Sequence, residues 1–140
     1  MTDTSPIRPG EPLIDDQALL ALAEFLHRGA DPRDRTLWFV MLDERRPLPF
    51  LVPVDGLPVE PSDVLLTSMG GRWEDVLREQ SADSLLFVLE RPGAETVGES
   101  DRAWLAALQD EADEHDLRVC GFFLATEAGV RPLAPDDWVP

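Results

Sequence analysis

The chain contains no lysine, asparagine or tyrosine, and its only isoleucines are Ile7 and Ile14. All 12 basic residues are therefore arginine. The codons for these four scarce residue types are rich in A and T, so the composition indicates a high-GC genome, such as that of an actinobacterium. The high arginine and aspartate content then reflects mutational bias and does not by itself indicate a function.

Positive charge is also scarce. The 12 arginines stand against 28 acidic residues, which gives a net charge of -16. The arginines are scattered, and no basic run is longer than Arg45-Arg46. A chain of this charge is repelled by nucleic acid and by anionic membranes, so we expect neither as a partner. Two interpretations of the acidity stay open: a solvated surface, or a docking face for a basic partner.

Long apolar runs are missing as well. No stretch approaches the 18 residues that a membrane-spanning helix needs. The polar, proline-rich start MTDTSPIRPGEP lacks the apolar centre of a signal peptide. The single cysteine, Cys120, lies in an apolar run and is expected to be a small buried hydrophobe. We therefore expect a cytoplasmic protein.

The motifs of the common catalytic chemistries do not occur. There is no CxxC, HxH or HExxH pattern, and a zinc site needs three or four N, S or O ligands. The phosphate-binding GxGxxG and GxxxxGK[ST] loops and the GxSxG elbow are also absent. His115 lies among carboxylates near a predicted helix end and is expected to be solvated. We predict no catalytic residue, no metal site and no cofactor.

The first part of the chain predicts a helix followed by two strands. Residues 15–29 carry leucines at helical spacing. Leu37 to Leu42 is a continuous apolar run, which is typical of a strand buried on both faces. The next strand contains Pro49 and Pro53, which cannot donate hydrogen bonds, so it should lie at a sheet edge or be interrupted.

The middle of the chain predicts a helix over residues 62–80 and then a buried strand. Ser62 or Asp63 is a suitable N-cap for the helix. Gly70-Gly71 either breaks it or marks a close packing contact. The run Ser84 to Glu90 is apolar throughout its centre and predicts a central strand.

The last part predicts a helix and two strands. The helix should begin at Ser100 or Asp101, either of which is a suitable cap, and continue through the acidic segment before Leu117. Four carboxylates gather at its C-terminal end and form a candidate interaction surface: Glu111, Asp113, Glu114 and Asp116. Residues 117–133 read as a strand, a turn and a short strand.

This order of elements predicts a single α/β (α+β) domain over residues 14–134, with a flexible arm at 1–13 and a tail at 135–140. We expect a mixed β-sheet of about five strands with three helices packed on it.

The stretch from Leu37 to Leu133 resembles the JAB/MPN superfamily in its RadC-like form. FVMLDERRPLPFLVPV resembles the first hairpin of that family, and RPG lies where its H-P-S-G segment would be. The segment that begins ESDRAWLAALQ resembles the following S-x-x-D helix. The resemblance implies a JAB/MPN-like fold.

The resemblance also implies a degenerate site, formed by Leu89, Glu90, Arg91, Ser100 and Asp101. In active members, two histidines and an aspartate hold zinc, and an earlier glutamate is the general base. Leu89 and Arg91 stand at the histidine positions, and neither ligates a metal. Asp101 matches the aspartate with altered spacing, and no residue matches the glutamate. The resemblance therefore implies the fold and argues against hydrolase activity.

Two arrangements of this site stay open. In the first, Arg91 pairs with Asp101, because a carboxylate in a partly buried groove needs a partner. In the second, Arg91 points to solvent and Asp101 is only a helix cap.

Three functions follow from the sequence. The first is a non-catalytic scaffold that binds an unknown protein partner, or a second copy by strand addition at its proline-rich edge. The second is a binder of a small ligand or anion, or a metal-independent enzyme, using the Glu90–Gly93 loop and the N-terminus of the Ser100 helix. The third is an acidic inhibitor of a basic partner.

Overall fold

The computed structural model describes residues 16–27, 35–44 and 46–134. The predicted arm at 1–13 and tail at 135–140 lie outside these residues. The elements follow one another in the predicted order: α1 (Asp16–His27), β1 (Thr36–Asp43), β2 (Arg46–Asp55), α2 (Asp63–Glu79), β3 (Ser84–Glu90), α3 (Glu99–Glu114), β4 (Arg118–Thr126) and β5 (Gly129–Leu133).

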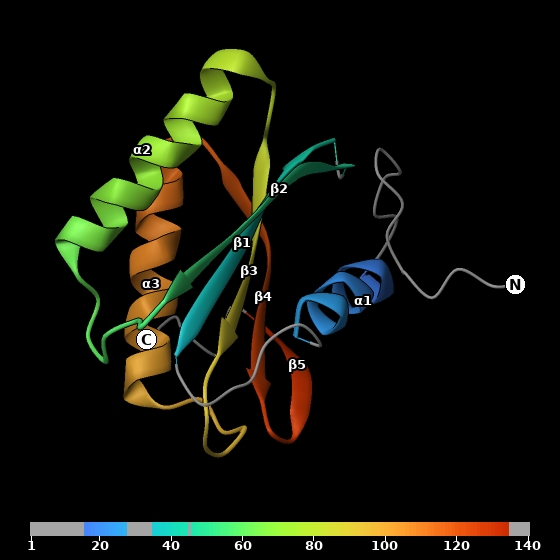
Figure 1. Ribbon diagram of the computed structural model, residues 1–140, viewed down its shortest axis with the longest axis vertical. Coiled ribbons are helices and arrows are strands. Elements are labelled where there is room, and N and C mark those ends of the chain that lie inside the picture. The colour runs from blue at the N-terminus through green and yellow to red at the C-terminus, as the bar shows by residue number, and fades with distance from the viewer. Residues whose placement is uncertain (1–15, 28–34, 45, 135–140) are drawn as a thin grey trace, which may run out of the picture.

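The five strands form one mixed sheet in the order β2-β1-β3-β4-β5 (Figure 1). The β3–β4 pair is parallel and is connected through α3, whereas the other neighbouring pairs are antiparallel. The prediction of about five strands and three helices is confirmed. The strand with the prolines, β2, lies at an edge of the sheet as expected, and β3 is central.

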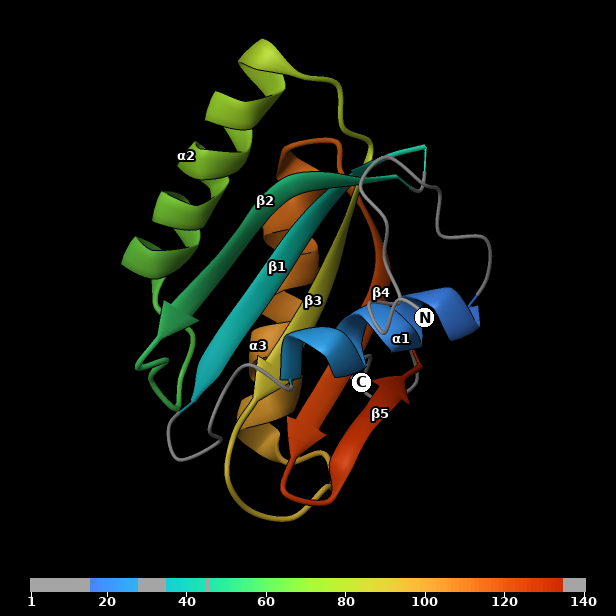
Figure 2. The same ribbon diagram turned by 45° about the vertical axis from the view of Figure 1, so that its right-hand side comes forward.

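Helices cover both faces of the sheet. Figure 2 shows α1 crossing β3, β4 and β5 on one face, with α2 and α3 on the other. The larger apolar cluster lies beneath α2 and α3 and is centred on Trp73, Phe87 and Trp104. The smaller cluster contains Leu22 and Ala23 of α1. In the part of the chain that is described, no helix is long and apolar enough to cross a membrane.

The central strands are buried on both faces, as their continuous apolar sequences predict. All of β3 is buried, and β1 is buried except at Trp38 and Asp43, which are partly exposed. Side chains alternate between the two clusters along each strand, so Leu89 belongs to the α2/α3 face whereas Val88 belongs to the α1 face. This alternation fixes where the residues after β3 point. Cys120, expected to be a small buried hydrophobe, is partly buried and packs against the apolar cluster of the α1 face.

Helix α2 begins at the predicted cap, since the Ser62 hydroxyl accepts a hydrogen bond from the Leu65 N–H. It continues without a break through Gly70-Gly71. The predicted close packing contact is found at Gly70, because a Cβ at that position would lie 2.5 Å from His115 Nε2. A Cβ on Gly71 would meet nothing within 4 Å.

Helix α3 begins earlier than predicted. Its N-cap is Gly98, not Ser100 or Asp101. Asp101 lies within the first turn, where its carboxylate accepts a hydrogen bond from the Gly98 N–H. The capping carboxylate therefore reaches back to the helix start from inside the helix, and it is favourably placed at the positive end of the helix dipole.

Candidate functional site

Arg91 and Asp101 form a buried, bidentate ion pair at the end of β3. Arg91 Nε donates to Asp101 Oδ1 at 2.9 Å, and Nη2 donates to Oδ2 at 2.8 Å. Their side chains are only 10% and 2% exposed. The backbone N–H of Arg91 extends the parallel pairing by donating to the Ala125 carbonyl. Of the two arrangements that the sequence left open, the pairing is observed, and Asp101 also satisfies the helix start.

The remaining N–H groups of Arg91 hold the loop that leads into α3. They donate to the carbonyls of Pro92 at 3.1 Å, Ala94 at 2.7 Å and Thr96 at 2.9 Å. A guanidinium has five N–H groups, and with the two bonds to Asp101 each of them has an acceptor. The loop turns at Gly93, whose φ of 102° favours glycine. Arg91 therefore organises residues 92–98 and has no donor left for a ligand.

A second arginine, Arg35, lies beside this pair and was not predicted. Its Nη2 donates to Ser100 Oγ at 2.7 Å, and the Ser100 hydroxyl donates to the Val59 carbonyl. Burial lowers the pKa of Arg35. The negative charge of Asp101 acts in the opposite direction and raises this pKa, whereas the positive charge of Arg91 lowers it further. A guanidinium stays protonated despite such a shift. Arg35 directly precedes Thr36, which pairs with Glu90 across the β1–β3 ladder. Only this strand register could have indicated that Arg35 lies beside Arg91.

The predicted site residues converge only in part. Leu89 is buried in the apolar cluster beneath α2 and α3. Glu90 is 1% exposed, and by strand alternation its side chain lies on the α1 face, where its carboxylate accepts a hydrogen bond from Trp38 Nε1. Arg91, Ser100 and Asp101 form a separate cluster. The sheet thus divides the predicted site into two.

The residues at this position do not fit the zinc that the resemblance would imply. Leu89 has no ligand atom, and Arg91 presents a positive charge whose donors are all used. Among the described residues, no three His, Cys, Asp or Glu side chains are arranged to hold a metal ion. Asp101 alone is no metal site, since both its oxygens accept hydrogen bonds from Arg91.

The acidic end of α3 is only partly an open surface. Asp113, Glu114 and Asp116 are exposed, as predicted. Glu111 is not, because its side chain is 15% exposed and its Oε2 lies 3.0 Å from His115 Nε2. The prediction of a solvated His115 was also wrong: the ring is 18% exposed and lies between two carboxylates.

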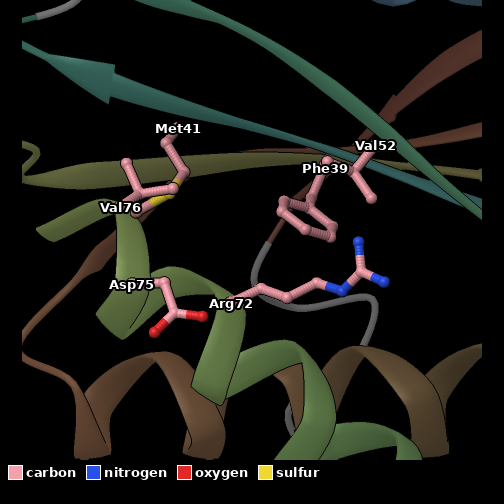
Figure 3. Close-up of a pocket in the computed structure, with 6 residues that line it drawn as sticks. All are labelled: Phe39, Met41, Val52, Arg72, Asp75 and Val76. Atoms are coloured by element: carbon pink, nitrogen blue, oxygen red, sulfur yellow. The ribbon is translucent and has the colours of Figure 1, made fainter.

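A groove of about 200 Å³ lies between α2 and the β1–β2 edge of the sheet (Figure 3). We call it the α2–β2 groove, and its lining residues are Phe39, Met41, Val52, Arg72, Asp75 and Val76. The strands contribute apolar side chains, whereas α2 contributes Val76 and the exposed charges Arg72 and Asp75. Sequence reasoning missed this groove. The available signals were alternate positions on one strand and an i, i+3, i+4 set on one helix.

Comparison with known proteins does not identify the chain: neither a scan against protein-family models nor a search of curated proteins found a match. The JAB/MPN resemblance therefore stays a prediction.

Proposed function

We propose that this chain is a non-catalytic, cytoplasmic protein-interaction domain that binds a partner protein in the α2–β2 groove. The observation that carries the proposal is the groove itself: an apolar floor beside an edge strand, with one charge of each sign on its helical wall. A scaffold role is also what the resemblance to a JAB/MPN domain without zinc ligands implies. The closed Arg91–Asp101 pair supports the non-catalytic part, because it uses the groups that chemistry at that position would need.

The partner chemistry follows from the lining of the groove. An apolar side chain of the partner would pack over Phe39, Met41 and Val52. Phe39 and Met41 are already almost fully buried, so the gain of about 25 cal/mol per Å² would come from the partner's own apolar surface and from the partly exposed Val52. Charged groups beside that side chain would meet Arg72 and Asp75 on the rim, where Asp75 already pairs with Arg78 at 3.0 Å. Such exposed charges select the orientation of the partner more than they add affinity.

Strand addition at the β2 edge is a less favoured way for this chain to bind a partner protein. Among the described residues, no strand pairs with the outer side of β2. Positions 47, 49 and 53 are prolines, however, and they offer no N–H to an added strand. Two copies with a net charge of -16 each also repel one another. We therefore favour a different protein over a second copy as the occupant.

The two alternative functions have less support. For an anion or small ligand at the Glu90–Gly93 loop, the guanidinium of Arg91 is fully engaged, and the Ser100 hydroxyl is bound by Arg35 and Val59. An acidic inhibitor of a basic partner rests on the net charge alone.

The proposal is tested with a photo-crosslinking amino acid placed at residue 72 of the full chain in cells of the source organism. We expect a discrete crosslinked partner from this position, since Arg72 lines the groove and is exposed. The matched control is the same amino acid at Asp110, an exposed position on α3 away from the groove lining. Equal adducts from both positions, or none from residue 72, would count against the groove.

A further inference from the structure

His115 joins α2 to the C-terminal end of α3. It is the C-cap residue of α3. Its Nδ1 lies 2.5 Å from Glu74 Oε1 of α2, and its Nε2 lies 3.0 Å from Glu111 Oε2 of α3. An imidazole can donate from both nitrogens only when it is protonated. The geometry, with a carboxylate at each nitrogen, therefore matches the charged ring, and we call His115, Glu74 and Glu111 the His115 clamp.

Helix α2 leaves room for this clamp at one position. A Cβ on Gly70 would lie 2.5 Å from His115 Nε2 and 2.6 Å from Glu111 Oε2, so any larger residue displaces the ring or the carboxylate. The absence of a side chain at residue 70 thus allows the ring to enter between the helices.

The clamp and the α2–β2 groove share the same two turns of α2. Gly70 and Glu74 contact the clamp, whereas Arg72, Asp75 and Val76 line the groove. Trp73 connects the two sides. Its ring packs edge-on against the ring of His115 and edge-on against the ring of Phe39 in the groove floor, with a distance of 5.9 Å between ring centroids in each pair. A displacement of α2 at the clamp therefore reaches the groove through a buried, rigid side chain.

We propose that the His115 clamp is a pH-sensitive device that holds α2 against α3 and thereby sets the width of the α2–β2 groove. The regulatory meaning of this device rests on the proposed function, because it presumes that the groove binds a partner. The clamp itself does not, because its titration can be measured without any partner.

The direction of the pH dependence follows from the ring's surroundings. The hydrogen bond to Glu74 raises the pKa of His115 above its ordinary 6.5; burial opposes this, and the bond to Glu111 and the charges of both carboxylates add to it. Stability from a group with a raised pKa is fully present below the unfolded value of 6.5 and is lost as the pH rises through the folded pKa. The clamp thus holds at mildly acid pH and opens toward alkaline pH.

The test is an NMR pH titration of the full chain carrying His27→Gln, which leaves His115 as the only histidine. The ring of His115 and the methyl groups of Met41, Val52 and Val76 are followed together. We expect the ring to titrate above 6.5 and the groove methyls to shift with the same midpoint. Groove methyls that stay flat, or that follow another midpoint, would overturn the proposal.

Paired variants separate the clamp from nonspecific effects. Glu74→Gln should lower the His115 midpoint, whereas Glu79→Gln, at an exposed position on the same helix, should leave it unchanged. Gly70→Ala should displace the ring and uncouple the methyl shifts from it, while Gly71→Ala should not. An unchanged midpoint in Glu74→Gln would contradict the inference. If crosslinking at residue 72 fails, the proposed function is wrong, whereas the pH dependence of the His115 clamp is unaffected by that outcome.

Discussion

Replacement of Asp101 with alanine is expected to lower the free energy of unfolding by about 3–5 kcal/mol, because it leaves the buried charge of Arg91 without its partner. Asp101 is 2% exposed and receives two hydrogen bonds from Arg91 and one from the Gly98 N–H. Both the ion pair and the start of α3 lose their acceptor. Urea-induced unfolding followed by tryptophan fluorescence measures the loss.

The matched control is Asp110→Ala, an exposed aspartate on the same helix, which should change stability by about 0.5 kcal/mol or less. A double-mutant cycle with Arg91→Met adds a second readout. The loss in the double variant should be smaller than the sum of the two single losses, since no buried charge is then left unpaired. If Asp101→Ala costs no more than Asp110→Ala, the pair does not organise this part of the fold.

The second large effect is expected at Trp73. Trp73→Ala should cost about 3–5 kcal/mol, the range for removal of a large aromatic side chain from a core. The ring is 0% exposed and contacts Phe39, Phe87 and His115. It therefore connects the sheet, the groove floor and the His115 clamp, and its removal leaves a cavity beneath α2. Thermal and urea unfolding of the two proteins give the difference.

Trp73→Phe is the informative comparison. Trp73 Nε1 has no hydrogen-bond partner among the described residues, so phenylalanine loses apolar contact but no hydrogen bond. Its cost should be clearly smaller than that of alanine. Equal losses in the two variants would contradict the expectation that a buried aromatic ring of either size stabilises this position by packing.

The fold was predictable where one local signal decided each element. The unbroken apolar runs of β1 and β3 indicated strands buried on both faces, and the prolines of β2 indicated an edge. The start of α3 was predicted wrongly because Gly98 carries no capping side chain. The capping carboxylate belongs to Asp101, which lies three residues after Gly98 and accepts a hydrogen bond from the Gly98 N–H. The sequence alone does not distinguish an aspartate at the N-cap position from an aspartate in the first turn that bonds to the N-cap residue.

The candidate sites were predictable only in part, because their contacts join distant segments. The pairing of Arg91 with Asp101 was accessible, since one loop connects them. Arg35 and Ser100 are 65 positions apart, and His115 and Glu74 are 41 apart. Such neighbours are set by strand register and helix packing, and no pattern within one segment indicates them. The α2–β2 groove was missed for the same reason, as it needs two strands and a helix.

The two candidate sites differ in how far the protein's own contacts already use their polar groups. At the end of β3, arginine donors and carboxylate oxygens are used by the protein's own loop and helix. Beside β2, the α2–β2 groove has a largely buried apolar floor, with the partly exposed Val52 at its edge and the charges of Arg72 and Asp75 on its helical wall. The proposed JAB/MPN relationship would make the first place a former metal site, and we propose the second as the place where the partner binds.

The most direct test of this account is the affinity of the protein crosslinked through residue 72 for three variants of the full chain. Val52→Arg fills the groove and should weaken binding by about tenfold or more. Val64→Arg, at a valine of α2 that is 79% exposed and does not line the groove, should leave the affinity unchanged. Arg102→Glu, in the first turns of α3 near the Arg91–Asp101 pair, should also leave it unchanged. Binding that is lost in Arg102→Glu and retained in Val52→Arg would contradict the account, because it would place the functional surface at the end of β3.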